Sequence, residues 1–230
     1  MPECRGIDDG LTTESNNKLA PFNPSSEQIQ QLAVNLFALG PHDVLCDIGC
    51  GDGRMLCFAA AKTPGLRCVG IELDPRYAAR GYERIQRQQL AARVTIRIED
   101  GTKQLVAVDD DDAAEDTKIK INNKNNSKNN DNNSNINSNR KEETHGQKPL
   151  TELTLYEDAT AIYLFVLPKG IVKLMKLLQQ VVDKRIRDGR TLKVISYMFR
   201  IHAWEPTMVD KTAKAGFSVY YYEFGRTVLD

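Results

Sequence analysis

Apolar side chains recur every three or four positions between residues 29 and 37, as in a helix that covers a hydrophobic core. Ser25 and Ser26 stand where either can cap this helix, and Gly40-Pro41 ends it. The next run, residues 44–48, is short and almost wholly apolar. Its length and composition predict a buried strand that follows the helix directly.

Strand-like and helix-like patterns then alternate along the chain. Further strands are predicted over 67–73, 94–98, 161–166, 192–197, 207–209 and 217–224, and further helices over 54–62, 76–90 and 171–182. Alternation of this kind favours a parallel sheet with right-handed crossovers, whereas the β-rich tail favours an antiparallel strand at the end of the sheet. The predicted fold class is α/β, a doubly wound, seven-stranded, mostly parallel sheet with one antiparallel strand.

Both periodicities stop between residues 109 and 148. An acidic run opens this stretch, and residues 122–139 are mostly Asn. Because such a segment cannot bury enough apolar surface to offset its ordering entropy, we expect a disordered insertion there and a disordered tail over residues 1–20. Residues 21–108 and 153–230 then form a single domain, since the roughly 170 residues left suffice for one core.

Composition and charge narrow the class of protein. With 31 Lys+Arg and 31 Asp+Glu the formal net charge is zero, so no nucleic-acid partner is expected. No apolar run approaches the ~18 to 20 residues that a membrane-spanning helix needs, so no transmembrane segment is expected. Five cysteines without a C-x-x-C pair, together with no secretory signal, indicate a reducing intracellular compartment, either cytoplasm or mitochondrion. No metal site is expected, and the sequence assigns no oligomeric state.

The strand over 44–48 runs into a glycine loop, Gly49-x-Gly51-x-Gly53, and then into a helix. Glycines permit the positive φ of a tight turn, and they let a ligand touch the backbone beside the free N–H groups of a helix N-terminus. The spacing differs from the G-x-G-x-x-G of dinucleotide-binding proteins. The three glycines therefore predict a binding loop for a small molecule other than a dinucleotide.

Three predicted strands each carry a carboxylate at or near the carboxyl end, which is the ligand edge of an open α/β sheet. Asp47 would repel a pyrophosphate but suits an ammonium group. Glu72 can accept both hydroxyls of a ribose, and Asp100 can reach an adenine amino group, with Glu99 as its substitute after a one-residue slip. S-adenosyl-L-methionine carries an ammonium and a sulfonium but no phosphate, so it is the predicted cofactor.

These motifs resemble the class I S-adenosylmethionine-dependent methyltransferases, whose fold is Rossmann-like. More narrowly, they resemble the small protein-lysine N-methyltransferases that modify the adenine nucleotide translocase and the ATP synthase c subunit. The family's usual Tyr is replaced here by Phe22, its N-terminal membrane-associating or mitochondrial segment is missing, and the Asn-rich insertion is extra. The matching positions are Asp47, Gly49, Gly51, Asp52, Gly53 and Arg54 in the loop, Gly70, Glu72 and Pro75 after it, Phe199, Trp204 and Pro206 near the C-terminus, and Phe22, Pro24 and Ser25 before the first helix.

The resemblance implies an enzyme that methylates a lysine side chain of a protein substrate, with Phe22, Phe199 and Trp204 on the catalytic side. An apolar, aromatic wall would lower the pKa of the lysine and present it as a neutral nucleophile. Trp204 either bounds this acceptor channel or closes the core beneath the last strands. The alternatives are a methyltransferase acting on a small molecule or RNA, and a non-catalytic scaffold that retains the fold. Other candidates for the wall are Phe165, Leu167, Pro168, Tyr197 and His202.

Overall fold

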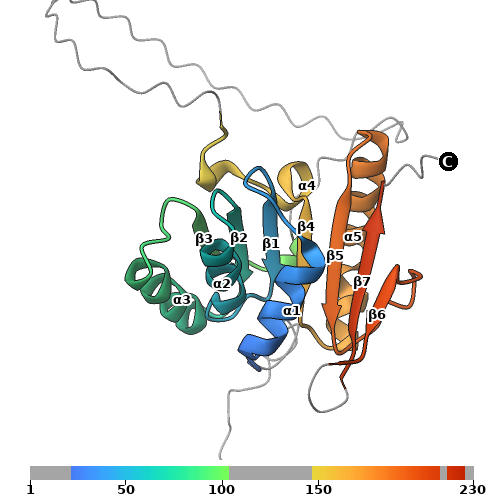
Figure 1. Cartoon of the computed structure of the whole chain (residues 1–230), viewed down its shortest axis with the longest axis horizontal. Helices are drawn as coiled ribbons and strands as arrows, with labels where there is room; N and C mark the ends of the chain where they lie inside the picture. The colour runs from blue at the N-terminus through green and yellow to red at the C-terminus, as the bar shows by residue number, and fades with distance from the viewer. Residues whose placement is uncertain (1–21, 104–146, 213–216, 226–230) are drawn as a thin grey trace, which may run out of the picture. The chain divides into compact units, whose positions relative to one another are not determined.

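A computed structural model describes residues 22–103, 147–212 and 217–225, and these contain one sheet in the order β3-β2-β1-β4-β5-β7-β6 (Figure 1). The first five strands of this order pair in parallel, and β7 is antiparallel to both β5 and β6. The α/β fold class with a single antiparallel strand is thereby confirmed. The strands are β1 (Val44–Ile48), β2 (Arg67–Glu72), β3 (Val94–Ile98), β4 (Ala161–Leu164), β5 (Leu192–Tyr197), β6 (Met208–Asp210) and β7 (Val219–Phe224).

The helices cover both faces of the sheet. Successive residues of a strand point to opposite faces, and accordingly Leu45 lies in one buried cluster and Cys46 in the other. Side chains of the first three helices join the cluster of Leu45, and those of the last two join the cluster of Cys46. The helices are α1 (Glu27–Phe37), α2 (Arg54–Lys62), α3 (Pro75–Arg87), α4 (Leu155–Asp158) and α5 (Pro168–Arg187), with 3-10 turns η2 (Gly101–Lys103) and η3 (Leu150–Glu152).

Helix α5 is longer than the apolar pattern over 171–182 predicts. It begins with Pro168 in its first turn, where the missing N–H costs nothing, and continues to Arg187. Arg185 explains the extension, because its charged side chain is buried and donates to the Glu157 carbonyl at 3.1 Å. A prediction that counts every arginine as exposed therefore ends this helix more than one turn too early.

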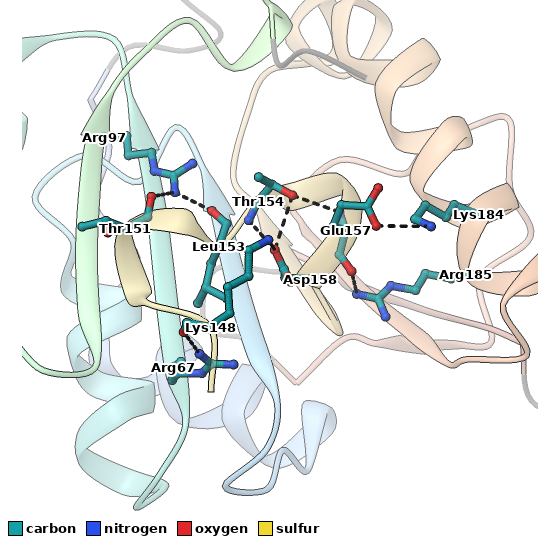
Figure 2. A network of polar contacts seen from close by, with 10 residues as sticks. All are labelled: Arg67, Arg97, Lys148, Thr151, Leu153, Thr154, Glu157, Asp158, Lys184 and Arg185. Atoms are coloured by element: carbon teal, nitrogen blue, oxygen red, sulfur yellow. Dashed lines mark hydrogen bonds and ion pairs between the residues drawn. The ribbon is translucent and has the colours of Figure 1, made fainter. Parts of the chain in front are cut away.

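The chain that returns from the predicted insertion is fastened to the sheet by charged side chains (Figure 2). Arg67 of β2 donates to the Lys148 carbonyl at 2.7 Å, and Arg97 of β3 donates to the Thr151 carbonyl at 2.7 Å. Lys148 itself pairs with Asp158 of α4 at 2.8 Å. The predicted tail over residues 1–20 lies outside the described ranges. So does the predicted insertion over 109–148, apart from its last two residues.

The four cysteines of the described residues, Cys46, Cys50, Cys57 and Cys68, are free and buried. Burial raises the pKa of the Cys46 thiol to about 12 and that of Cys57 to about 11, so both are protonated at neutral pH and chemically inert. In the same part of the chain no helix is long and apolar enough to cross a bilayer, and no cluster of three or more metal-ligating side chains occurs.

Candidate functional site

A cavity of about 300 Å³ lies at the carboxyl ends of the central strands, the edge at which open α/β sheets bind ligands. Its volume is within the range of small-molecule sites. Its walls come from a lead segment (residues 22–25), the glycine loop, the residues that follow β2 and β3, and residues of β4 and just beyond it. Five separate stretches of sequence therefore converge on one small space.

The glycine loop has the left-handed backbone that its residues predict, with φ of 81° at Gly49 and 55° at Gly51. The Gly49 N–H donates to the Ile71 carbonyl at 2.8 Å, which ties the loop to β2. At Gly51 a Cβ atom would lie 2.8 Å from Cε2 of Phe22, so only glycine lets the lead segment close over the loop. Gly49 and Gly51 both line the cavity.

Gly53 has a different environment from the other two glycines. It is the N-cap of α2 with φ of 66°, and it does not line the cavity. A Cβ on Gly53 would lie 2.9 Å from Cδ1 of Ile96, so the missing side chain lets the loop pack against β3. The structure thus gives Gly53 a packing role where the sequence predicts cofactor binding.

Replacing Gly51 with alanine is expected to weaken ligand binding in the cavity by about tenfold. The left-handed backbone costs a non-glycine residue about 1–2 kcal/mol, a strain that the free loop relieves by leaving the geometry that binds the ligand, and the new methyl group would displace the Phe22 ring. Titration of the variant measures the total loss. The double variant Gly51→Ala with Phe22→Ala should recover only the part of the affinity that is lost to the clash with the Phe22 ring. If the double variant bound the ligand as the wild type does, backbone strain at Gly51 would be contradicted.

Glu72, at the end of β2, braces the glycine loop. One carboxylate oxygen accepts the Gly51 N–H at 2.8 Å, and the other accepts the Asp74 N–H at 2.8 Å. Each oxygen keeps a further lone pair, and the residue lines the cavity. Glu72 is therefore held in a fixed orientation, with acceptor capacity left for two hydroxyl donors.

Asp47 lies on the cavity floor and is 4% exposed. Within the described ranges no hydrogen bond reaches its carboxylate, although a buried charge normally has a partner. Burial raises the pKa of Asp47 well above its ordinary value, and the negative charges of Glu72 and Asp52 raise it further. The site therefore holds an acid that a cationic ligand would stabilise.

Asp100 follows β3 and lines the cavity, as does its neighbour Glu99. Its side chain accepts the Thr102 N–H at 2.9 Å and the Thr102 hydroxyl at 2.6 Å. Partial burial raises the pKa of Asp100, but these bonds and the charge of Lys103 outweigh burial and hold the pKa below its ordinary value. Asp100 is thus an ionised acceptor at neutral pH.

Asp52 of the loop binds arginine. Its carboxylate pairs with Arg54 at 2.7 Å and with Arg84 of α3 at 2.7 Å. Burial raises the pKa of Asp52, but the two guanidinium groups outweigh burial and lower it. The ion pair between Asp52 and Arg84, which are thirty-two residues apart, holds the start of α2 against α3. The sequence pattern does not predict this pair.

The lead segment is fixed at two points. The Phe22 ring stacks on Tyr77 of α3, with ring centres 4.2 Å apart and planes at 13°. The Ser25 hydroxyl and the Tyr163 hydroxyl share a hydrogen bond of 2.8 Å. Sequence reasoning missed Tyr77 and Tyr163, although a tyrosine inside the apolar β4 signals a buried hydroxyl that needs a partner.

The structure brings neither Phe199 nor Trp204 to the cavity. Trp204 is 8% exposed in the cluster on the α5 face, and its Nε1 donates to Oε1 of Gln179 at 2.9 Å. Its ring meets Tyr222 and Phe224 of β7 edge-on. Of the two interpretations of Trp204, the geometry favours the side chain that closes the core.

A Trp204→Phe variant is therefore expected to lose stability while its affinity for a cavity ligand stays unchanged. The lost bond to Gln179 is worth about 1 kcal/mol, which lowers the melting temperature by about 2–4 °C in a chain of this size. Thermal melting and a ligand titration test both halves. Weaker ligand binding at full stability would place Trp204 at the acceptor channel instead.

Comparison with known proteins supports the fold. A scan against models of protein families matches none. An RNA methyltransferase from Salinibacter ruber, crystallised with S-adenosyl-L-homocysteine, is similar to this chain with a TM-score of 0.56 and 20% identity, covering 90% of this chain and 96% of that one. This likeness shows the Rossmann-like fold of the class I methyltransferases.

A curated protein-lysine N-methyltransferase of Saccharolobus islandicus (strain REY15A) is 25% identical over 76 residues, which is 33% of this chain. The matched region spans only about half of that relative, 47% of its length. A methyltransferase from Geobacter sulfurreducens, also crystallised with S-adenosyl-L-homocysteine, is 15% identical to this chain with a TM-score of 0.46. The match covers 77% of this chain and 51% of that one.

Proposed function

We propose that this protein transfers a methyl group from S-adenosyl-L-methionine to the side-chain amine of a protein lysine. The observation that carries the proposal is the buried carboxylate of Asp47, which has no partner among the described residues and lies beneath the glycine loop. A buried anion without a partner is costly, so its presence is best explained by a cationic ligand.

The residues of the cavity fit this cofactor group by group. Asp47 offers its carboxylate to the ammonium, the oriented oxygens of Glu72 accept the two ribose hydroxyls, and Asp100 accepts the adenine amino group. S-adenosyl-L-methionine, when bound, supplies an electrophilic methyl group on a sulfonium.

The charge of the cavity also suits a lysine as acceptor. Arg54 is its only lining cation among the residues described, and it pairs with Asp52. Such a charge balance attracts a protonated amine to the mouth and repels the phosphates of a nucleic acid. The lining carboxylates are Asp47, Asp52, Glu72, Asp74, Glu99 and Asp100.

An aromatic wall would complete the acceptor site. Phe165, just after β4, lines the cavity and packs against Tyr197 of β5 with ring centres 4.6 Å apart. Phe22 and Tyr77 line another part of it. Rings around an amine remove water from it and lower its pKa, which frees the lone pair for attack. The walls then hold the nucleophile in line with the methyl group, the main contribution to rate in such a displacement.

The Saccharolobus islandicus relative is itself a protein-lysine N-methyltransferase, which supports the choice of lysine. RNA and small molecules are the competing acceptors. The acidic lining of the cavity disfavours the phosphates next to a target base of RNA. A non-catalytic scaffold would have no need for Asp47, which raises the energy of the folded state without a ligand.

The proposal is tested by incubating the full chain with methyl-labelled S-adenosyl-L-methionine and a cell extract. We expect label that protease releases and ribonuclease does not, and mass spectrometry should place it on lysine. An Asp47→Ala chain should transfer none. Label in RNA or in a small molecule would overturn the lysine acceptor, and no label in any fraction from a folded, cofactor-binding protein would favour the scaffold.

A further inference from the structure

The outer face of α3 carries one arginine at nearly every turn. Arg76, Arg80, Arg84 and Arg87 recur at intervals of four, four and three residues, which places them on one side of the helix. The opposite side, with Ala78, Gly81 and Ile85, is buried against the sheet. We call the four residues the arginine stripe. Glu83, the only acid within α3, lies on the same side of the helix, and the four arginines still leave the stripe with a net positive charge.

Two members of the arginine stripe have no ion-pair partner in the described part of the chain. Arg76 pairs with Asp74, and Arg84 pairs with Asp52. Arg80 instead lies over the Tyr77 ring at 5.5 Å, and Arg87 is exposed. The charges of Arg80 and Arg87 are thus available to a binding partner.

The arginine stripe begins next to a residue that lines the cavity. Tyr77, in the first turn of α3, lines the cavity, and Arg80 and Arg87 follow it by about 5 and 15 Å along the helix axis. A second hollow of about 610 Å³ is lined by Arg84 of the stripe and by Arg54 and Phe58, with Glu27 as the acid among its described lining residues. Arg54 lines both hollows, so the two hollows adjoin at this side chain, on the face of the sheet that α2 and α3 cover (Figure 1).

We infer that the target lysine is flanked by an acidic stretch of the substrate protein, whose carboxylates bind the arginine stripe while the lysine enters the cavity. This inference rests on the proposed function. The two surfaces have opposite charge, so they suit a segment in which a lysine and carboxylates stand a few residues apart. An extended chain rises about 3.3 Å per residue, so carboxylates within about five residues of the lysine reach from Tyr77 to Arg87.

The observations favour an acidic protein over RNA. The phosphates next to a target base would meet the carboxylates of the cavity. Bases also need open aromatic faces on which to stack. One face of Tyr77 is covered by Phe22 and the ring also has Arg80 over it, while Lys62 lies over Phe58 at 5.4 Å.

The test uses the full chain and three fluorescent peptides of equal length with one central lysine, flanked by glutamate, glutamine or lysine. A single-stranded RNA and vesicles of anionic lipid serve as the other probes. The test variant is the double substitution Arg80→Gln with Arg87→Gln. The matched control is Lys176→Gln with Arg187→Gln, which removes two exposed cations from α5 on the opposite face.

Binding is followed by anisotropy, and methyl transfer to each peptide is measured separately. The glutamate-flanked peptide should bind most tightly, and the test variant should weaken it about fivefold, as expected for two exposed ion pairs, with a smaller effect at high salt. The control should bind as the wild type does. Equal binding of all three peptides, no effect of the test variant, or a stripe-dependent preference for RNA or vesicles would overturn the inference. If one of these outcomes overturned the inference but the protein still methylated the glutamine-flanked peptide, the proposed function would stand. Failure of the inference and failure of the proposed function are therefore distinguishable.

Discussion

Replacing Asp47 with asparagine is expected to stabilise the ligand-free protein and to remove most of its affinity for S-adenosyl-L-methionine. The two effects have one cause. Burial raises the pKa of Asp47, with Glu72 and Asp52 adding to the shift, so ionised Asp47 destabilises the fold. Asparagine has nearly the same shape and no charge. It also cannot neutralise an ammonium, which should cost about 1.5–3 kcal/mol of binding, or about 10- to 150-fold.

The raised pKa of Asp47 decides how its effect on stability changes with pH. Because the folded pKa of Asp47 lies above the unfolded value, its contribution to stability is fully present at pH below the unfolded pKa and is lost as the pH rises through the folded one. The stabilisation by Asp47→Asn should therefore be small in acid and grow toward neutral pH. Binding of a cation releases the proton, so the affinity of the wild type should rise with pH over the same window and that of the variant should not.

Thermal melting across pH and a parallel titration test both effects. Asp43→Asn is a suitable control, because Asp43 precedes the same strand at its other end and accepts the Gly40 N–H at 2.7 Å. The control should lose a little stability and bind as the wild type does. If Asp47→Asn melted lower than the wild type at neutral pH, or bound the cofactor unchanged, Asp47 would be a structural acid.

Glu72→Ala is expected to weaken cofactor binding by about 10- to 100-fold and to lower stability by about 1–3 kcal/mol. The variant leaves the N–H groups of Gly51 and Asp74 without their acceptor and removes the partner for the ribose hydroxyls. Loss of the brace and loss of the direct contact both contribute. Glu72→Gln keeps one acceptor oxygen, so its loss should be intermediate.

A cofactor analogue without one ribose hydroxyl separates the two contributions. If Glu72 binds the ribose, the Glu72→Gln substitution should cost less affinity for the analogue than for the cofactor itself, because part of the interaction is already missing. Glu83→Gln, on the exposed side of α3, is the control for a lost charge. Equal losses for both ligands would limit Glu72 to bracing the loop.

The sequence predicts the order of elements well because most are short and strongly patterned. The strands at residues 44–48, 94–98 and 192–197 and the helix at 54–62 have the predicted bounds. The bounds of α5 differ most from the prediction, because the buried Arg185 breaks the assumption that charge means exposure. Helix α4 was not predicted, and α3 ends three residues before its predicted end. The glycine loop and its carboxylates were predictable for a different reason. A tight turn at the end of a buried strand needs glycine, and parallel strands bring their ends to one edge.

The remainder of the site depends on contacts between distant residues, which no local pattern encodes. The bond between Ser25 and Tyr163 joins positions 138 residues apart. Gly53 matches the loop motif yet packs against Ile96, because the third glycine faces away from the cavity. Trp204 likewise matches a motif but finds its hydrogen-bond partner on α5. Residue type alone does not tell which side of the sheet a side chain occupies.

The central claim is that the acid-lined cavity binds S-adenosyl-L-methionine through Asp47 and Glu72. The most direct test is a calorimetric titration of the purified full chain with this molecule, run beside NAD. The account predicts saturable binding of S-adenosyl-L-methionine, stronger at higher pH, and none of NAD, whose pyrophosphate the carboxylates repel. Binding of NAD, or no binding of either molecule to the folded protein, would contradict it.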